Sequence, residues 1–181
     1  IKWAAAQPWC NGRVGMMGIS WGGFNSLQVA ALAPDALKAI ITLCSTVDRY
    51  ADDIHYKGGC LLNENLGWGA TMWSYSSRAP DPALRADWRE MWLDRLKNEP
   101  FLPSLWLRHQ RRDAYWQHGS VCEDFGAIKA KVLAVGGWGD SYKNAVPQLV
   151  EALDGAKGIV GPWVHKYPHF AVPEPRIGFL Q

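Results

Sequence analysis

Four stretches of the chain have the apolar pattern of strands in a parallel sheet. Residues 12–17 form a short apolar run, 37–44 are almost continuously apolar and rich in β-forming residues, and 131–136 repeat the pattern. A shorter run at 158–161 predicts a last strand. Continuous rather than alternating apolar sequence is typical of parallel strands that are covered on both faces. The pattern therefore predicts an α/β fold with a doubly wound sheet.

Helical patterns separate these predicted strands. Small and apolar residues predict a helix over 24–33 that Pro34 ends, and 143–154 has the spacing of an amphipathic helix. Residues 1–11 are interpreted as the end of a helix that leads into a turn at 8–12, because Asn-Gly is a turn signal. The alternation of strands and helices agrees with the α/β assignment.

The periodicity changes after about residue 50. No buried strand is predicted between there and residue 122. Asp81 and Pro82 predict the start of a helix, because Asp is a favoured N-cap and Pro fits the first helical turn. Large apolar residues at helical spacing continue this helix to Pro100, and a second short helix is predicted at 102–110.

These segments divide the chain into two kinds of region. Residues 1–50 and 123–181 carry the predicted α/β core, and residues 51–122 form a helical cap insertion between them. A chain of 181 residues is long enough to bury one core of this kind. Because it begins at Ile1, almost directly before a strand, we expect it to be an internal piece of a longer protein.

Composition narrows the classes of function. The net charge is +2, with 20% charged residues and no basic block, which does not indicate a nucleic-acid partner. No apolar run reaches the length of a membrane span and no signal peptide opens the chain, so no membrane partner is expected. A cytoplasmic location is favoured, while the compartment and the oligomeric state stay open. Eleven tryptophans suit an apolar substrate pocket as well as a core.

The cysteines do not indicate a metal or redox site. The chain has four of them, and none has Cys-x-x-Cys spacing, so we expect reduced thiols and no cofactor. They are Cys10, Cys44, Cys60 and Cys122. Cys44 lies in a predicted strand and is expected to be a small buried apolar residue.

Ser20 lies in the pattern Gly18-x-Ser20-x-Gly22, between a predicted strand and a predicted helix. This is the context of a nucleophile elbow, in which a sharp turn exposes a serine hydroxyl. The glycines are expected where the returning chain passes too close for a Cβ. The N–H of Trp21, the residue after the serine, is then expected to donate to an oxyanion, while the second donor normally comes from an earlier loop.

A serine nucleophile needs a base, and the base needs an orienting acid. Asp140 follows the strand at 131–136, and His165 follows the strand at 158–161, so the chain order is Ser, Asp, His. That order is the one found in α/β hydrolases, and the carboxyl ends of parallel strands are where such sheets carry their sites. We therefore predict Ser20, Asp140 and His165 as a catalytic triad.

Each of these residues has an alternative interpretation. Ser20 as an ordinary turn serine is disfavoured by its glycine neighbours, whereas Asp140 as the cap of the helix near Lys143 stays open. His169 is the alternative to His165, which lies closer to the strand end. The remaining histidines fall in the cap and are expected on its surface or in a pocket: His55, His109 and His118.

Three motifs resemble the CocE/NonD and X-Pro dipeptidyl-peptidase (S15) family of serine hydrolases. They are Gly-Arg-Val-Gly-Met-Met-Gly-Ile-Ser-Trp-Gly-Gly at 12–23, Gly-Gly-Trp-Gly-Asp at 136–140 and Gly-Pro-Trp-Val-His at 161–165. Asp-Asp-Ile-His-Tyr-Lys-Gly-Gly at 52–59 also looks like the beginning of the family's cap. The resemblance covers nearly the whole chain and gives Ser20, Asp140, His165 and the Trp21 amide the same roles.

The resemblance also implies parts that this sequence does not contain. The family has an α/β-hydrolase domain, a helical cap and a C-terminal jelly roll, so the first strands of the sheet and the jelly roll are expected to be missing here. An upstream Tyr that completes the oxyanion hole is also expected to be missing. The segment alone is therefore expected to have little activity, since one oxyanion donor contributes about 10²–10³ in rate.

Family members cleave esters or amides of small acyl groups, so the implied partner is a small-molecule ester or amide. The amino-ester branch of the family binds a substrate ammonium with carboxylates, and Asp52 and Asp53 stand at one such position. Trp138, within the second motif, is assigned to substrate binding as well. For Asp52 and Asp53, helix capping is the favoured alternative. An X-Pro dipeptidyl-peptidase and a non-catalytic binding protein on a hydrolase scaffold are the other functional hypotheses.

Overall fold

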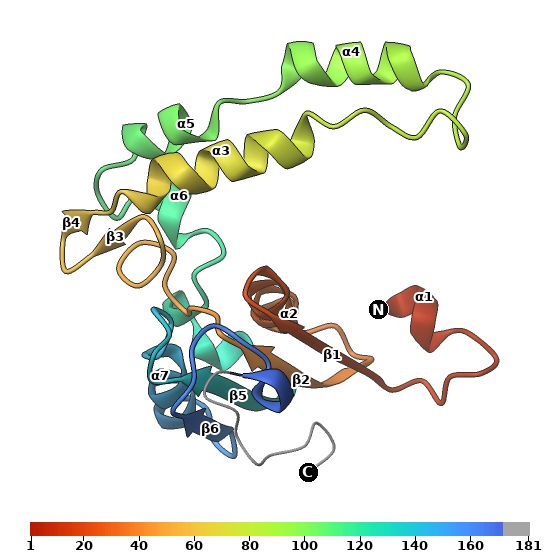
Figure 1. The fold of residues 1–181 in the computed structure, drawn as a ribbon. Coiled ribbons are helices and arrows are strands. Elements are labelled where there is room, and N and C mark those ends of the chain that lie inside the picture. The colour runs from red at the N-terminus through yellow and green to blue at the C-terminus, as the bar shows by residue number, and fades with distance from the viewer. Residues whose placement is uncertain (172–181) are drawn as a thin grey trace.

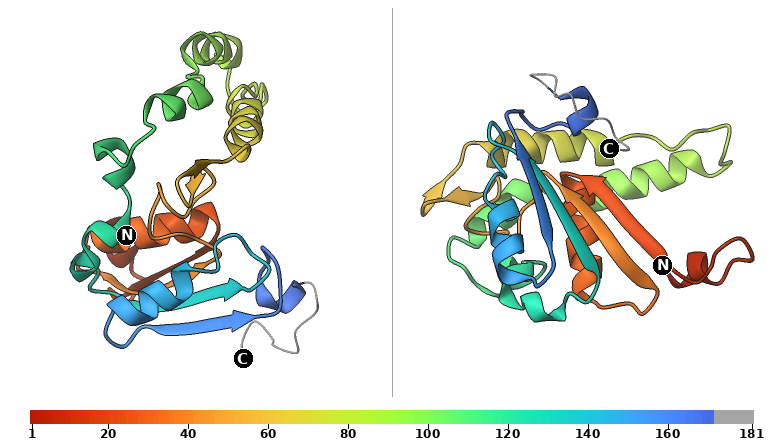
Figure 2. Two further views of the ribbon diagram at one scale, coloured as in Figure 1. Left: turned by 90° about the vertical axis from the view of Figure 1, so that its left-hand side faces the viewer. Right: turned by 90° about the horizontal axis from the view of Figure 1, so that it is seen from below.

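The structure, a computed structural model, describes residues 1–171 of the chain (Figure 1). Its centre is a four-stranded sheet in the order β1-β2-β5-β6, and every neighbouring pair in it is parallel (Figure 2). These strands are β1 (Val14–Ile19), β2 (Leu37–Leu43), β5 (Lys131–Gly137) and β6 (Lys157–Gly161). The predicted α/β class and all four predicted strands are confirmed. Residues 172–181 of the predicted third segment lie outside the described residues.

Two helices cover the same face of this sheet. Helix α2 (Trp21–Ala31) connects β1 to β2, and α7 (Ala145–Ala152) connects β5 to β6. One buried apolar cluster joins both helices to the strands: Leu27 and Ala30 of α2, Val146 and Leu149 of α7, and Leu37, Ile40 and Val132 of the sheet. Burial of such side chains is the main stabilising contribution to a fold of this type.

The strand register places the ends of β1, β5 and β6 at one edge of the sheet. One row of paired residues crosses all four strands: Ile19, Leu43, Val135 and Ile159. Because the strands are parallel, each of them leaves this row toward the same edge. The segments that follow β1, β5 and β6 therefore meet there, as the sequence predicted for an α/β site.

The chain leaves the sheet after β2 and returns to it at β5. This excursion contains a separate two-stranded hairpin and a series of helices, which Figures 1 and 2 show rising away from the sheet above α2. Its elements are β3 (Tyr56–Lys57), β4 (Cys60–Leu61), α3 (Glu64–Ser76), α4 (Trp88–Asn98), α5 (Leu102–Arg108), α6 (Ala114–Gln117), η1 (Val121–Glu123) and η2 (Phe125–Ala127). The two remaining described elements are α1 (Lys2–Ala5) and η3 (Pro168–Phe170).

The predicted helix start at Asp81 is wrong. Helix α4 begins at Trp88, and Asp81 instead accepts a hydrogen bond from the N–H of Ala83 at 2.8 Å in an isolated turn. Asp residues cap such turns as readily as they cap helices, so the local pattern did not separate the two. Helix α3 was not predicted, because its large side chains do not form one apolar stripe; Leu66 and Trp73 are both exposed.

No helix among the described residues is long and apolar enough to cross a bilayer.

Close backbone contacts pack α2 against the sheet. A Cβ at Gly18 would lie 2.6 Å from the backbone of Gly22, and a Cβ at Gly23 would lie 2.7 Å from the carbonyl oxygen of Leu43. The expected close approach is therefore present at Gly18. It is absent at Gly22, where an added Cβ would meet no atom within 4 Å. The glycine that faces the second strand is Gly23.

This asymmetry gives a test of the packing. Gly18→Ala is expected to lower the free energy of unfolding by about 1–3 kcal/mol, the usual cost of overpacking against atoms that cannot move aside. Gly22→Ala is the matched control, and because Gly22 is helical the substitution should be neutral or stabilise by up to about 1 kcal/mol. Urea unfolding followed by circular dichroism measures both, and equal destabilisation would contradict the packing argument.

Candidate active site

Ser20 occupies a strained turn between β1 and α2. Its backbone has φ 56° and ψ −118°, a left-handed φ that side chains rarely adopt. The turn is fixed on both sides, because the Ser20 N–H donates to Leu43 O and the Ser20 carbonyl accepts from the Phe24 N–H, each at 2.9 Å. The strand–turn–helix context predicted from the Gly-x-Ser-x-Gly pattern is therefore present.

Trp21 is the first residue of α2. Its N–H belongs to the amide groups at the helix start that no carbonyl of the same helix can accept. The positive end of the helix dipole lies at the same place, which favours negative charge there. The local structure thus provides one donor of the type that an oxyanion needs, next to the Ser20 hydroxyl.

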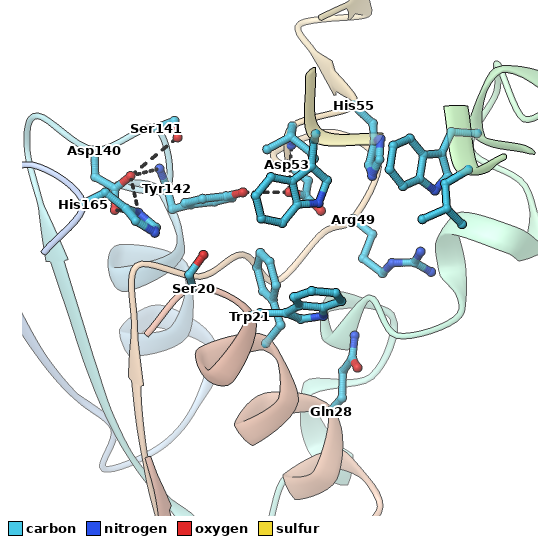
Figure 3. A pocket seen from close by; sticks show the side chains of 15 residues that line it. Ser20, Trp21, Gln28, Arg49, Asp53, His55, Asp140, Ser141, Tyr142 and His165 are labelled. Carbon is cyan, nitrogen blue, oxygen red and sulfur yellow. Dashed lines mark hydrogen bonds and ion pairs between the residues drawn. The ribbon is translucent and has the colours of Figure 1, made fainter. Parts of the chain in front are cut away.

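Asp140 and His165 are brought into direct contact. The Nδ1 atom of His165 lies 3.1 Å from Oδ1 and 3.0 Å from Oδ2 of Asp140, although 25 residues separate the two (Figure 3). Only 2% of the Asp140 side chain is exposed, against 41% of the His165 side chain. Burial alone raises the pKa of the Asp140 carboxyl, but hydrogen bonds from His165 and Cys44 bring that pKa below its usual value. Asp140 is therefore ionised at neutral pH.

The alternative for Asp140 as the cap of the following helix is wrong. Helix α7 begins at Ala145, with Asn144 at its N-cap position. The backbone N–H that donates to Asp140 is that of Tyr142, at 3.3 Å, which lies before the helix. Helix α7 is shorter than predicted because residues 141–144 turn before it starts.

Ser20 and the Asp140–His165 pair line one cavity of about 450 Å³. Within residues 1–171 no hydrogen bond joins Ser20 to His165. In Figure 3 the Ser20 hydroxyl lies below the pair, on the same side of the cavity. Contacts between a nucleophile and its base often shorten only when substrate is bound. The alternative residue, His169, lies in η3 and is not part of the cavity wall.

The cavity has an aromatic wall and a polar far side. The aromatic side chains on it are Trp21 and Phe24 of α2, Trp68 of α3, Trp106 of α5 and Tyr142. The polar ones farther from Ser20 and the Asp140–His165 pair are Gln28, Arg49, Asp53 and His55. Of these residues, Trp21, Asp53 and His55 could be singled out from the sequence. The others had no signal beyond the surplus of tryptophan, because they come together only through the fold.

His55 is buried between two tryptophan rings, each with its centre 4.6 Å from the imidazole. The rings belong to Trp106 and Trp116, and Asn65 Oδ1 lies 2.7 Å from His55 Nδ1. Burial lowers the pKa of His55 despite the opposing effects of Asn65 and Asp53, so it is uncharged at neutral pH. It therefore contributes to the cavity wall as a neutral, hydrogen-bonded ring.

The Arg49 guanidinium is held by backbone carbonyls rather than by a carboxylate. Its Nη1 donates to the carbonyl of Tyr115 at 2.9 Å and to that of His118 at 2.6 Å. Its guanidinium also lies 5.3 Å from the centre of the Tyr115 ring and 5.5 Å from that of Trp116. These contacts fix α6 against the chain that leaves β2.

The three predicted substrate-binding residues have different positions. Asp53 lines the cavity, whereas Asp52 does not, and Trp138 is exposed and outside the cavity wall. The helix-capping interpretation of Asp52 and Asp53 is wrong, because no helix begins near them; Asp52 forms an isolated antiparallel bridge with Lys57. Both residues are buried, each 7% exposed.

A group of metal-binding atom types lies at the same place. The Sγ of Cys44, an oxygen of Asp140 and a nitrogen of His165 lie within 4.8 Å of one another, the one such group of three among residues 1–171. Because Asp140 and His165 are already hydrogen-bonded to each other and Cys44 is buried beneath them, the arrangement is explained as an acid–base pair packed on a thiol. All four cysteines are free, as predicted.

Comparison with known proteins identifies the family to which this chain is similar over most of its length. The sequence profile of the X-Pro dipeptidyl-peptidase (S15) family matches residues 1–167. Cocaine esterase from Rhodococcus sp. (strain MB1 Bresler) is 30% identical over 192 aligned positions, which cover 91% of this chain and 33% of the esterase. The chain thus spans about a third of the length of that relative.

Solved structures share the fold. A CocE/NonD family hydrolase from Staphylococcus aureus is similar with a TM-score of 0.68 and 22% identity, over 88% of this chain and 26% of that one. An aminopeptidase from the marine sediment archaeon Thaumarchaeota archaeon is similar with a TM-score of 0.63 and 21% identity, over 91% of this chain and 31% of that one. At these identities the likeness shows the fold alone.

The environment of Cys44 gives a chemical test of the site. Burial, followed by the nearby Asp140 carboxylate, raises the pKa of the Cys44 thiol, so little thiolate is present at neutral pH. Iodoacetamide at pH 8 should therefore modify exposed Cys60 at least about tenfold faster than Cys44, as measured by peptide mass spectrometry. Urea should abolish the difference. Equal rates in the folded protein would show that Cys44 is not enclosed behind Asp140.

Proposed function

This chain belongs to the X-Pro dipeptidyl-peptidase (S15) family, and on that basis we propose that it carries the catalytic centre of a serine hydrolase that cleaves esters or amides of small acyl groups. The family assignment itself shows that the chain is part of a hydrolase of the S15 and CocE/NonD group. The serine mechanism and the substrate class are our proposals. One observation carries them: Ser20 at its strained turn lines the same cavity as the Asp140–His165 pair.

The proposed reaction begins with attack of Ser20 Oγ on the substrate carbonyl carbon. Since Nδ1 of His165 faces Asp140, Nε2 is the nitrogen that accepts the serine proton. Asp140 holds the ring in this orientation and stabilises the imidazolium that forms. The carbonyl oxygen becomes an oxyanion, which the N–H of Trp21 stabilises by a hydrogen bond.

Collapse of this intermediate breaks the bond to the leaving group, which takes the proton from Nε2 of His165 as an alcohol or amine. An acyl group remains on Ser20. Water then gives a proton to the same nitrogen and attacks the acyl carbon, and a second collapse releases the carboxylic acid and restores the serine. Each proton that enters the reaction thus passes through His165.

The cavity supports an apolar acyl or leaving group. Trp21 and Trp68 meet edge to face with their centres 6.2 Å apart, and Phe24 and Tyr142 do so at 5.5 Å. Aromatic walls of this kind bind flat or branched apolar groups. We propose that residues 51–122 act as a cap, because α3 and α5 of that segment supply Trp68, Leu102 and Trp106 to the cavity.

A second candidate is a proline-specific exopeptidase, which has to bind the N-terminal ammonium of its substrate. The observation that favours it is Asp53, a buried carboxylate on the cavity wall. Burial raises the pKa of Asp53, and hydrogen bonds from the Ile54 N–H and the Tyr142 hydroxyl oppose this effect only in part. Release of 4-nitroaniline from an X-Pro anilide, compared with 4-nitrophenol from an acyl ester, separates the two activities.

A fluorophosphonate probe tests the serine mechanism. The complete protein should be labelled, and Ser20→Ala should abolish labelling and lower kcat for an ester by about 10⁶-fold, because the nucleophile is lost. Ser74→Ala is the matched control, since Ser74 lies in α3 outside the cavity wall and its hydroxyl donates to the Thr71 carbonyl. Absence of labelling in the unaltered protein would instead favour a binding protein on a hydrolase scaffold.

The acid–base pair is tested separately. Asp140→Asn keeps the size of the side chain but removes the charge that orients the imidazole, so kcat is expected to fall by about 10⁴-fold with little change in KM. Steady-state kinetics with a 4-nitrophenyl ester measure both constants. The control is Asp154→Asn, because Asp154 is exposed and lies after the end of α7. An unchanged kcat in the Asp140→Asn variant would show that Asp140 does not take part in the reaction.

A further inference from the structure

The loop that carries Asp140 is held from two sides. We call residues 138–144, between β5 and α7, the acid loop. On one side, the N–H of Trp138 donates to Gly161 O at 2.9 Å and the N–H of Gly139 donates to Trp163 O at 3.0 Å. These bonds tie the first part of the acid loop to the segment that carries His165.

The second part of the acid loop contacts a distant segment, residues 52–57, which we call the strap. The Nζ of Lys57 donates to the carbonyl of Ser141 and lies 3.0 Å from Oδ1 of Asp52. The Nδ2 of Asn144 donates to the same Oδ1 at 3.1 Å. Oδ1 of Asp52 thus contacts both the Lys57 ammonium of the strap and the Asn144 amide of the acid loop. The same ammonium also donates to the backbone of the acid loop.

A further contact joins the strap to the acid loop beside Asp140. The hydroxyl of Tyr142 donates to Oδ1 of Asp53 at 3.0 Å, and both side chains are buried. Burial raises the pKa of Tyr142, so the phenol keeps its proton and is the donor. Buried hydrogen bonds are stronger than exposed ones, because the local dielectric constant is low.

These contacts cross a long stretch of sequence and connect two parts of the fold. The bonded pairs are separated by 84, 89 and 92 residues. The strap lies where the chain leaves the sheet for the hairpin β3–β4 and helix α3. The position of the cap is therefore linked mechanically to the position of the acid loop.

Asp52 is better explained by this link than by substrate binding. It does not line the cavity, and its Oδ1 is occupied by Lys57 and Asn144. Its Oδ2 is buried and has no hydrogen-bond partner among the described residues. A buried carboxylate with an unpaired oxygen costs folding free energy, which is typical of a residue retained for a role other than stability.

We propose that the strap positions the orienting acid: Asp52, Lys57 and Asp53 hold the acid loop so that Asp140 stays against His165. The inference rests on the proposed function, because Asp140 has to act through His165 for its position to matter. Asp52 and Lys57 are then positioning residues that influence the chemical step without touching the substrate. Asp53 combines a bond to the acid loop with a place on the cavity wall.

The test compares two esters with the same leaving group, one with a neutral acyl group and one with an α-amino acyl group. In the complete protein, Asp52→Ala should lower kcat about 10–100-fold for both esters, the usual cost of losing an outer contact to a functional group, and change KM less than about threefold. Asp52→Asn keeps an acceptor oxygen for Asn144 and should recover most of kcat. Fluorophosphonate labelling of Ser20 should slow in parallel.

Lys57→Met provides the second variant, in case Asp52→Ala does not fold, and should also lower kcat for both esters. Lys129→Met is the matched control, because Lys129 likewise donates to a backbone carbonyl, that of Gly126, away from the cavity. Thermal unfolding shows which variants are folded.

Three outcomes would overturn the inference. If Asp52→Ala raises KM for the α-amino ester alone, and Asp52→Asn does not restore it, then Asp52 is a substrate-binding residue. Unchanged kcat in folded Lys57→Met and Asp52→Ala would exclude positioning while leaving the proposed function intact. If the fluorophosphonate does not label the unaltered protein, the proposed function is wrong, and the positioning role that rests on it is wrong as well.

Discussion

The close packing of α2 on the ends of β1 and β2 is the constraint on which the candidate site depends. The chain has to turn from strand to helix within one residue, and the absence of a Cβ at Gly18 and Gly23 allows the backbones to approach that closely. Ser20 takes up the turn with φ 56°, a strain that costs about 1–3 kcal/mol and has to be held by its surroundings. The position of its hydroxyl is therefore set by the core.

Parallel pairing brings the other two side chains to the same edge. Asp140 follows β5 and His165 follows β6, which are neighbours in the sheet, so two short loops suffice to place a carboxylate against an imidazole. The carboxylate is buried and the imidazole is exposed, so the negative charge lies on the enclosed side and the ring remains accessible. In the proposed mechanism, the buried carboxylate orients the ring and the accessible ring transfers protons.

Much of this arrangement could be predicted from the sequence, because its causes are local. Buried parallel strands have continuous apolar sequence, and the turn at Ser20 requires a glycine two residues before it, at Gly18. The cap was predicted less well. Helix α3 exposes Leu66 and Trp73, so its pattern lacks the apolar stripe that marks an amphipathic helix. Asp81 precedes Pro82 as at a helix start but caps only a turn.

The misinterpretation of Asp52 and Asp53 has a different cause. An Asp pair before an apolar residue is consistent with a helix cap, and nothing nearby in the sequence argues otherwise. Their actual partners, Asn144 and Tyr142, are about ninety residues away and become neighbours only when β5 takes its place in the sheet. Tertiary partners of this kind decide the role of a polar residue, and a single sequence does not contain them.

One side chain, Tyr142, joins the cavity wall to the acid loop. Tyr142 presents its ring to the cavity opposite Phe24, bonds its hydroxyl to Asp53, and lies two residues after Asp140. In the proposed function, a substrate group packed on this ring would contact the acid loop directly, while Trp68 on the other side belongs to the proposed cap. Since cap, acid loop and α2 meet around one small space, occupancy of the cavity and alignment of Asp140 with His165 depend on the same contacts.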